Sequence, residues 1–569
     1  MLKRLLWLIP FAPPLLLGGF LLCNAVDCPF WDEWSHCYTF LHARDGTLTP
    51  QHLFSQANEH RIPVLRAGML LLSADGRWDT RRGMAVSFLI AATVLTILAS
   101  LIRKHAGRSN WPAIALTIFA SAFVFSPLQY ENWLWGDQWA MFVPGLCLCL
   151  ACVINTSAMR FGIKFALNVL LALLSQYSFG NGLLLWLLLP MTLINPFTGI
   201  LREHWRALVL WFVLACVAIT AYFWGYQHPE QHSPLTHSLR HPVALLKFMA
   251  CYAACPITSG LILSRKLHGL IAVLVYSFLA LGLWQLWRRR NDRPFCAQAM
   301  PWLMLALAGL GSGAMAALGR ATINDEAGLT ARYAAPSLFL VFPAFVLAAF
   351  PLFGTQVQST ANPHRLSKLY LRGCAIVLGS VLMISYVKGY ENFVQMSEAR
   401  RASKATLLCA RTVQTSDVTS KLFPAIDEFH SLLKRLDDLG LFRDRPLHGD
   451  FRELTICAPE PDIGRLASMR SDAQGKRMIS GWALHPPTRG RARSVVLTYA
   501  TPDGHLVPFA VGDLGMDEAE YRSDIGYAPR SGWEILSSWY VPEGATINAW
   551  SCDPEKMRAW KLAGECVWK

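Results

Sequence analysis

Long apolar runs separated by short polar connections dominate the chain. A helix of about twenty apolar residues crosses a hydrocarbon core of roughly 30 Å, so each such run predicts a membrane span. The candidate spans are residues 5–25, 84–102, 111–128, 139–155, 163–178, 182–196, 207–225, 268–287, 301–318, 334–353 and 372–388. The pattern therefore predicts an α-helical polytopic membrane protein with about eleven spans. The short pair 163–178 and 182–196 is broken by "SFGNG", which indicates a tight re-entry.

The connections between these runs indicate an orientation. If the N-terminal "MLKR" is cytoplasmic, the even-numbered connections share its side, and each carries at least two Lys or Arg, as cytoplasmic loops do. They read "RKHAGRSN" (103–110), "MRFGIK" (159–164), "LREHWRA" (201–207), "WRRRNDRPF" (287–295) and "HRLSKLYLR" (364–372). The odd-numbered connections carry most of the acids, aromatics and His, and they are 26–83, 129–138, 179–181, 226–267 and 319–333. An odd number of spans then places the tail after residue 388 outside the cytoplasm. No clear cleavage site follows the first run, so we expect it to remain as a span.

The tail changes character twice. Residues 411–442 show apolar positions at helical spacing with charges between them, which predicts an amphipathic helix. Residues 465–569 alternate short apolar runs with turn signals such as "HPPTRG" and "TPDG", which predicts a small β-sandwich. We expect its Trp residues to form a buried core rather than a carbohydrate-stacking surface. The chain thus divides into a transmembrane part (1–390), a helical linker outside the membrane (391–464) and a small β-rich extracytoplasmic domain (465–569).

Composition and charge narrow the class of protein. Of the 569 residues 53% are hydrophobic and 16% are charged, with a mean hydropathy of +0.31, which excludes an ordinary soluble protein. A net charge of +14 would suggest nucleic acid as the partner of a soluble protein. Here much of the basic excess lies in short connections, where it sets orientation. We therefore expect membrane lipids as partners and no nucleic acid.

The cysteines give no evidence for a metal site. Six of the fifteen lie in predicted outer segments, where three disulfides such as 28–37, 409–457 and 552–566 are permitted but cannot be deduced. The run "CLCLAC" (147–152) lies within a span without partner ligands. A cofactor therefore stays unknown from the residues.

Candidate chemistry begins in the first outer connection. "PFWDEWSH" (29–36) places Asp32 and Glu33 between two indoles beside the first span, and "NEHRIP" (58–63) brings Glu59, His60 and Arg61 together. Acids and aromatics are common at this depth, so "WDEW" alone is not diagnostic. Glu59 and Arg61 have a structural alternative as an ion pair that holds the loop.

The later odd-numbered connections add further polar groups. These are Glu131, Asn132, Asp137 and Gln138 in "LQYENWLWGDQW" (128–139), Asn181 in "YSFGNGLLLW" (177–186), and Arg320, Arg332 and Tyr333 in and beside "GRATINDEAGLTARY" (319–333). The two arginines have an ordinary alternative as interfacial anchors. Polar groups gathered on one side predict a water-filled cavity open to that side. Carboxylates, arginines and aromatic rings suit a site that deprotonates a hydroxyl, holds a phosphate and stacks on a sugar.

Residues 1–390 resemble the GT-C class of integral-membrane glycosyltransferases, and in particular bacterial membrane proteins with stretches similar to "NEHR", "ENWLWGDQ" and "GNG". The resemblance implies a sugar donor linked to polyprenyl phosphate, a glycan, lipid or protein acceptor, and a multi-pass protein of the bacterial cytoplasmic (inner) membrane with an extracytoplasmic C-terminus. It also implies that an acid of the first outer loop is the base. Either Asp32 or Glu33 corresponds to it, and we favour Asp32. Some members of the class need a divalent metal and others do not.

Other classes of function share parts of this pattern. A polysaccharide ligase that uses a pyrophosphate-linked donor would need similar groups. A lipid or glycan transporter (flippase) would also have many spans, but its charged residues usually interrupt the spans themselves. A non-catalytic assembly factor would explain the β-rich domain but not the acids and arginines of the loops.

Overall fold

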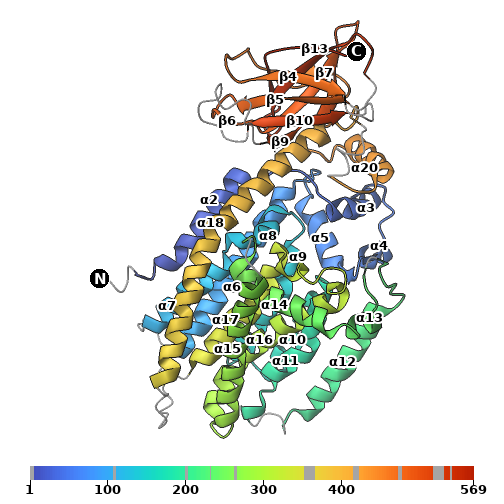
Figure 1. Cartoon of the computed structure of the whole chain (residues 1–569). Coiled ribbons are helices and arrows are strands. Elements are labelled where there is room, and N and C mark those ends of the chain that lie inside the picture. The colour runs from blue at the N-terminus through green and yellow to red at the C-terminus, as the bar shows by residue number, and fades with distance from the viewer. Residues whose placement is uncertain are drawn as a thin grey trace. The chain divides into compact units, whose positions relative to one another are not determined.

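A computed structural model gives the fold of the chain (Figure 1). It describes residues 6–106, 111–198, 203–230, 232–261, 265–350, 365–413, 422–471, 477–516, 531–537 and 541–568. Parts of three predicted basic connections (107–110, 201–202 and 364) and the end of the predicted span 334–353 lie outside these residues. The chain forms two compact units. The first comprises Met1–Asn24, Thr49–Gly68 and Gly83–Val394, and the second Ala25–Leu48, Met69–Arg82 and Gln395–Lys569.

Seven helical segments among the described residues are long and apolar enough to cross a membrane. They are α6 (Thr80–Ala106), α7 (Trp111–Val124) with the turns that follow it to Leu134, α12 (Trp205–Phe223), α15 (Arg265–Arg288), α16 (Arg293–Arg320), α17 (Ala334–Ala349) and α18 (Arg365–Cys409). Each coincides with a predicted span, although α18 continues well beyond residue 388. The protein is therefore a multi-pass membrane protein.

The remaining apolar helices are shorter. They are α2 (Ala12–Asn24) after a 3-10 turn, α5 (Pro63–Leu72), α9 (Trp139–Asn155), α10 (Phe161–Gln176), α11 (Leu185–Leu193) and α14 (Pro242–Thr258). The other four predicted spans fall on α2, α9, α10 and α11, so among the described residues seven of the eleven predicted spans coincide with helices long enough to cross a membrane, and the count of about eleven stays a prediction. Helix α14 lies inside the segment 226–267, which the sequence predicts to be a connection.

Close packing of α16 and α17 fixes one end of the helical bundle. A Cβ on Gly309 of α16 would lie 2.2 Å from the backbone nitrogen of Leu340 in α17, so only glycine permits this approach. The two helices are joined by a connection that contains η5 (Ala327–Leu329) and η6 (Ala331–Tyr333). The end of α16 and the start of α17 are consequently held at the same end of the bundle.

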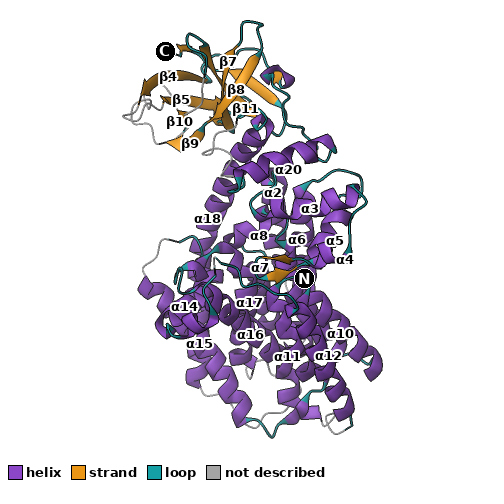
Figure 2. Cartoon of the chain, turned by 90° about the vertical axis from the view of Figure 1, so that its right-hand side faces the viewer, coloured by secondary structure: helices purple, strands orange, loops and turns teal. Residues whose placement is uncertain are grey.

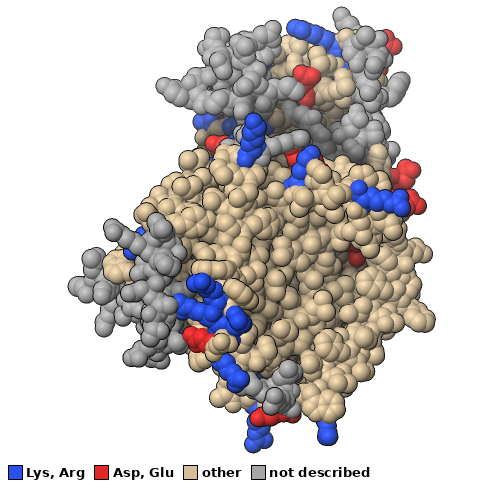
Figure 3. All heavy atoms as spheres, turned by 60° about the horizontal axis from the view of Figure 1, so that its bottom comes forward, with Lys and Arg blue, Asp and Glu red and all other residues tan. Residues whose placement is uncertain are grey.

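Basic residues gather at the opposite ends of these helices. Helix α16 begins after "WRRRND" (287–292), α12 begins after Glu203 and His204 beside Arg206, and α10 begins after Arg160. Figure 3 shows a broad surface without charged side chains, with Lys and Arg gathered toward its lower end. The starts of these three helices are the ends that the sequence predicts to be cytoplasmic, and that orientation stays a prediction.

The C-terminal part of the second unit is built from two sheets (Figure 2). One has the order β4 (Gly464–Ser471), β5 (Arg477–His485), β10 (Gly532–Ser537), β9 (Asp513–Met516), with β6 (Gly490–Arg491) paired to β5. The other has the order β3 (Thr455–Ile456), β12 (Arg558–Lys561), β11 (Thr546–Asp553), β7 (Ser494–Ala500), β8 (Leu506–Val511), with β13 (Cys566–Val567) paired to β11. All pairings are antiparallel except that of β3 with β12.

Both sheets contribute to one hydrophobic core, as a β-sandwich requires. Ile479 and Trp533 come from the first sheet, and Val495, Phe509 and Ile547 come from the second. The Trp side chains at 482, 533, 550 and 560 are all buried. The expectation that tryptophans form the core is confirmed for these four.

The rest of the second unit contains α3 (Asp32–Arg44) and α20 (Ile426–Asp438). Trp34 of α3 packs edge-on against Phe429 of α20, with ring centroids 4.8 Å apart. The amphipathic helix predicted over 411–442 is therefore present as α20, while residues 414–421 lie outside the described part. No disulfide joins any of the fifteen cysteines, all of which are described, so none of the three permitted pairs is formed.

Candidate functional site

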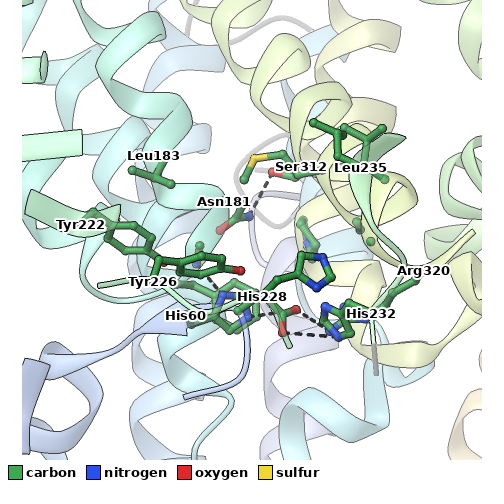
Figure 4. Close-up of a pocket in the computed structure, with 18 of the residues that line it drawn as sticks. His60, Asn181, Leu183, Tyr222, Tyr226, His228, His232, Leu235, Ser312 and Arg320 are labelled. Carbon is green, nitrogen blue, oxygen red and sulfur yellow. Dashed lines mark hydrogen bonds and ion pairs between the residues drawn. The ribbon is translucent and has the colours of Figure 1, made fainter. Parts of the chain in front are cut away.

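A cavity of about 250 Å³ lies within the first unit (Figure 4). Its lining residues come from the ends of α9, α12, α16 and α17 and from the turn between α10 and α11. Others come from the connection between α12 and the short helix α13 (Leu235–Leu239), from α13 itself, from η6, and from a small hairpin of β1 (Gln56–Ala57) and β2 (His60–Arg61). Of the residues singled out in the sequence, it brings together Glu59, His60, Asn181, Arg320 and Tyr333. These helix ends are the ones opposite the basic connections.

The hairpin presents Glu59 and His60 to the cavity. Ala57 pairs with His60, and Asn58 in the turn adopts the left-handed conformation (φ +48°), which asparagine tolerates better than most residues. Helix α4 (Pro50–Phe54) precedes it, and Arg66 of α5 donates to the carbonyls of residues 52, 53 and 55. The loop that carries "NEHR" is thus tied to the helices beside it.

Arg61 stabilises the hairpin and does not face the cavity. Its Nε donates to the carbonyl of Tyr222 at 2.6 Å, Nη1 to that of Phe54 at 2.8 Å and Nη2 to that of Trp224 at 2.5 Å. All three guanidinium nitrogens therefore donate to backbone oxygens, and Arg61 does not line the cavity. The ion pair considered for Glu59 in the sequence is formed with Arg320 and not with Arg61.

Glu59 and Arg320 form the charged centre of the cavity. Arg320 Nη2 lies 2.5 Å from Glu59 Oε1, and Nη1 donates to the hydroxyl of Tyr333. Two imidazoles face the same carboxylate: His60 Nε2 lies 3.5 Å from Oε1 and His232 Nε2 lies 3.6 Å from Oε2. One carboxylate thus meets one guanidinium and two imidazoles.

These neighbours determine the charge states. Burial alone would raise the pKa of Glu59, but His60, Arg320 and His232 outweigh burial and lower it. Burial lowers the pKa of His60 to about 4, with Glu59 opposing that shift and Arg320 adding to it. The Gly180 N–H donates to His60 Nδ1 at 3.2 Å, so the neutral ring carries its proton on Nε2, toward Glu59. Near pH 7 the cavity therefore holds an ionised Glu59, a neutral His60 and a charged Arg320.

The motif "GNG" has a steric explanation. A Cβ on Gly180 would lie 2.6 Å from His60 Nδ1, and a Cβ on Gly182 would lie 2.0 Å from the carbonyl oxygen of Ser175. Between them, Asn181 lines the cavity and its Nδ2 donates to Ser312 Oγ at 3.0 Å. The Asn181 Oδ1 atom is buried and has no hydrogen-bond partner among the described residues. The two glycines therefore let the turn pack closely against His60 and Ser175, and this packing fixes the position of the Asn181 backbone.

Apolar and aromatic side chains form the remaining walls. The ring of Phe179 packs on that of His60, with centroids 4.1 Å apart. The other apolar and aromatic lining residues are Met141, Leu183, Tyr222, Phe223, Tyr226, Leu235, Met315, Ala316, Leu318 and Pro336. The cavity is therefore polar at one end and apolar over most of its wall.

Five other candidates of the first unit do not line this cavity. Asn132 is buried and donates to the carbonyl of Arg332 at 3.1 Å, so it supports the connection just before Tyr333. Gln138 donates to Asp137 Oδ1 at 3.2 Å, and Glu131 lies in the short helix α8 (Tyr130–Leu134). Glu131, Asn132, Asp137, Gln138 and Arg332 are all absent from the cavity wall.

Asp32 and Glu33 belong to the second unit. Trp31 just before them has φ +47°, a strained conformation for a bulky residue. Glu33 is 3% exposed, and its Oε2 accepts a hydrogen bond from the Phe30 N–H at 2.8 Å, whereas Asp32 is half-buried. Glu33 thus stabilises the start of α3, and Asp32 is the more accessible acid.

Sequence reasoning did not single out His228, His232, Tyr222, Tyr226 or Ser312, which also line the cavity. The signal available was "YQHPEQHS" (226–233), where two histidines follow a span within one odd-numbered connection. No group of three or more His, Cys, Asp or Glu side chains in the described part of the chain could hold a metal ion.

Comparisons with protein-family models, with curated proteins and with solved structures find no match to the chain. An assignment of function rests therefore on the residues and geometry of the cavity.

Proposed function

We propose that the chain is a glycosyltransferase that transfers a sugar from a polyprenyl-phosphate donor to a cell-surface glycan or related acceptor. The observation that carries this proposal is the Glu59–Arg320 pair, set in a cavity whose other walls are mostly apolar and aromatic. A lipid-linked sugar phosphate combines an anion, a polar ring and a hydrocarbon chain. A cavity with a guanidinium at one end and apolar walls matches that combination.

Arg320 is the proposed binding group for the donor phosphate. Its two terminal nitrogens face the Glu59 carboxylate and the Tyr333 hydroxyl, so the fork of the guanidinium already points at oxygen atoms. The phosphodiester of a lipid-linked sugar offers two oxygens, which share one negative charge, to the same fork. Glu59 would then compete with the phosphate, while Tyr333 could donate to it.

The proposed reaction is a single displacement at the anomeric carbon. The acceptor hydroxyl oxygen bonds to that carbon, and the bond from the carbon to the phosphate oxygen breaks with its electron pair retained by the lipid phosphate. The hydroxyl proton passes to a carboxylate, for which we propose Asp32 on the family resemblance. Arg320 stabilises the charge that develops on the departing phosphate. One displacement without an enzyme-bound sugar inverts the anomeric centre.

We place the reaction at the outer face of the bacterial cytoplasmic membrane. The cavity lies at the ends of α10, α12 and α16 that are opposite their basic ends, and basic connections favour the cytoplasm. With about eleven spans, which would include the shorter helices α2, α9, α10 and α11, the C-terminal sheet domain would also lie outside the cytoplasm.

Mass analysis of surface glycans from cells with and without the chain tests the proposal. Cells that lack the chain should lose one sugar, and a gene carrying Arg320→Ala should not restore it. The purified chain in detergent should then add that sugar to glycans from the deletion strain, with lipid extract of the same strain as donor. A transporter only moves its substrate across a membrane, so it forms no new product in detergent, where no membrane separates two compartments. Absence of product in this assay would therefore contradict the enzymatic proposal.

A further inference from the structure

We propose that the end of the cavity at Asn181 is the subsite for the transferred sugar, and that it selects an uncharged ring whose hydroxyl donates to Asn181 Oδ1. The inference rests on the proposed function and specifies the class of sugar. It gives the "GNG" motif a role in recognising the sugar, in addition to forming the turn between α10 and α11.

The first support is the fixed orientation of the Asn181 amide. Its Nδ2 is committed to Ser312 Oγ at 3.0 Å, which leaves the oxygen as the acceptor available to a ligand. The oxygen is buried without a partner in the described part of the chain, a state that is costly for a polar group. In Figure 4 the oxygen points away from Ser312. A hydroxyl donor would satisfy it.

The second support is the position of Asn181 next to the charged centre. Gly180, the residue before it, donates to His60 Nδ1, and the opposite side of that ring faces Glu59. In Figure 4, Asn181 lies between the group formed by His60, His232 and Arg320 and the apolar residue Leu183. A sugar attached to a phosphate on Arg320 would extend from the charged centre toward Asn181.

The third support is the absence of a second cation at this end. Arg320 is the one Lys or Arg among the described lining residues, and it already faces Glu59. Asn181 also lines a small second pocket together with Ser312, Met141 and Pro336, none of which carries a charge, and Leu183 and Met315 of the main cavity are apolar. A uronic acid would place a second carboxylate beside a carbonyl oxygen without a cation, which is costly in a partly buried site.

Flexible and aromatic side chains complete the subsite. Met141 and Met315 have soft thioether chains that adapt to a ring and let it approach the recessed oxygen of Asn181. Tyr226 lines the same cavity and offers an aromatic ring, a surface that suits the apolar face of a sugar ring. A neutral hexose in this subsite would therefore meet the Asn181 oxygen as an acceptor, the Ser312 hydroxyl and the aromatic ring of Tyr226.

The test is binding of defined lipids to the full-length chain in a detergent without a sugar headgroup. The probes are polyprenyl methyl phosphate, a singly charged diester that carries no sugar, and the glucosyl, galactosyl, mannosyl and glucuronosyl polyprenyl phosphates. Wild-type protein should bind at least one neutral derivative about tenfold more tightly than the lipid without a sugar, as one added hydrogen bond allows. The glucuronosyl derivative should show no such gain.

The variants separate the subsite from the phosphate site. Asn181→Ala should remove the gain for the neutral derivative and leave binding of the lipid without a sugar unchanged, which also reports correct folding. Asn195→Ala is the matched control, because Asn195 donates to the Ala297 carbonyl outside the cavity, and it should keep the gain.

Two results would overturn the inference while the proposed function stands. One is an undiminished gain in Asn181→Ala, and the other is binding of the glucuronosyl derivative as tightly as the best neutral one. If wild-type protein binds none of these lipids, including polyprenyl methyl phosphate, the proposed function fails and the subsite fails with it.

Discussion

Glu59 and Arg320 are 261 residues apart in the chain, and their side chains meet at 2.5 Å inside the cavity. Both side chains are partly accessible, at 22% and 28%. An ion pair that lines a cavity and remains in reach of solvent is placed to exchange one partner for an anionic ligand. An ion pair that served stability alone would not need to line a cavity, because such pairs occur both in the interior and on the outer surface of proteins.

The first prediction concerns the guanidinium of Arg320. Arg320→Lys keeps the charge but loses the planar fork, so binding of polyprenyl phosphate should weaken by about tenfold or more. Titration of the purified variant with that lipid measures the effect. Arg290→Lys in an exposed basic connection is the matched control. Equal affinity of Arg320→Lys and wild type would remove Arg320 from the phosphate site.

The second prediction separates binding from turnover at Glu59. Glu59→Gln removes the carboxylate that competes for Arg320, so the affinity for polyprenyl phosphate should rise. Transfer should fall at the same time, because the arginine and His60 lose the group that orients them. Binding and transfer are measured on the same preparation. A lower affinity in Glu59→Gln would show that the carboxylate assists phosphate binding instead of opposing it.

The third prediction is a pH dependence of stability that comes from His60. Burial lowers its pKa from 6.5 to about 4, so the unfolded chain binds more protons than the folded chain between these values. The stabilising contribution is therefore present above about pH 6.5 and is lost as the pH falls toward 4.

His60→Asn tests this assignment, because its Oδ1 can still accept from the Gly180 N–H. Thermal unfolding between pH 4 and pH 7 should show a smaller pH dependence in the variant than in the wild type. Parallel profiles would assign the acid sensitivity to other groups.

The fourth prediction concerns the two acids of "WDEW". Asp32→Asn nearly preserves shape while it removes a proton acceptor, so transfer should fall by about two to four powers of ten with donor binding intact. Glu33→Gln should chiefly lower stability, by about 1 kcal/mol, because Glu33 accepts from the Phe30 N–H. Transfer assays and thermal unfolding of both variants provide the comparison. Full transfer activity in both would end the proposed mechanism.

The fifth prediction concerns the side of the membrane on which the tail lies. A reporter fused after residue 569 should behave as extracytoplasmic, because basic connections hold the other side and the proposed number of spans is odd. Paired reporters active only outside or only inside the cytoplasm make the measurement. A cytoplasmic signal would exclude eleven spans and would point to α14 as an additional crossing.

The length of the apolar runs and the spacing of apolar residues were enough to predict the helical membrane part, the turn at "SFGNG" and the sheet domain. These features depend on residues that are close together in the sequence. The partners of individual side chains depend on contacts between distant segments. Arg61 was grouped with Glu59 by adjacency, but its guanidinium reaches the carbonyls at the end of α12. In the sequence, Arg320 and Arg332 are equivalent candidates for phosphate binding, because they lie near the two ends of the same connection. The helix end at Arg320 turns that side chain into the cavity, whereas Arg332 lies outside the wall.

The three carbonyls bound by Arg61 also bear on how a bulky lipid could enter. Separating residues 54–61 from the end of α12 breaks two charge-assisted hydrogen bonds, from Arg61 to the carbonyls of Tyr222 and Trp224, so we expect the two segments to move together. The wall near α13 is attached to the end of α16 by two bonds of neutral groups, Ser233 N–H to the Gly319 carbonyl and the Thr322 hydroxyl to Ser233 Oγ. We therefore expect the cavity to open at the α13 side, while the hairpin stays attached to the end of α12.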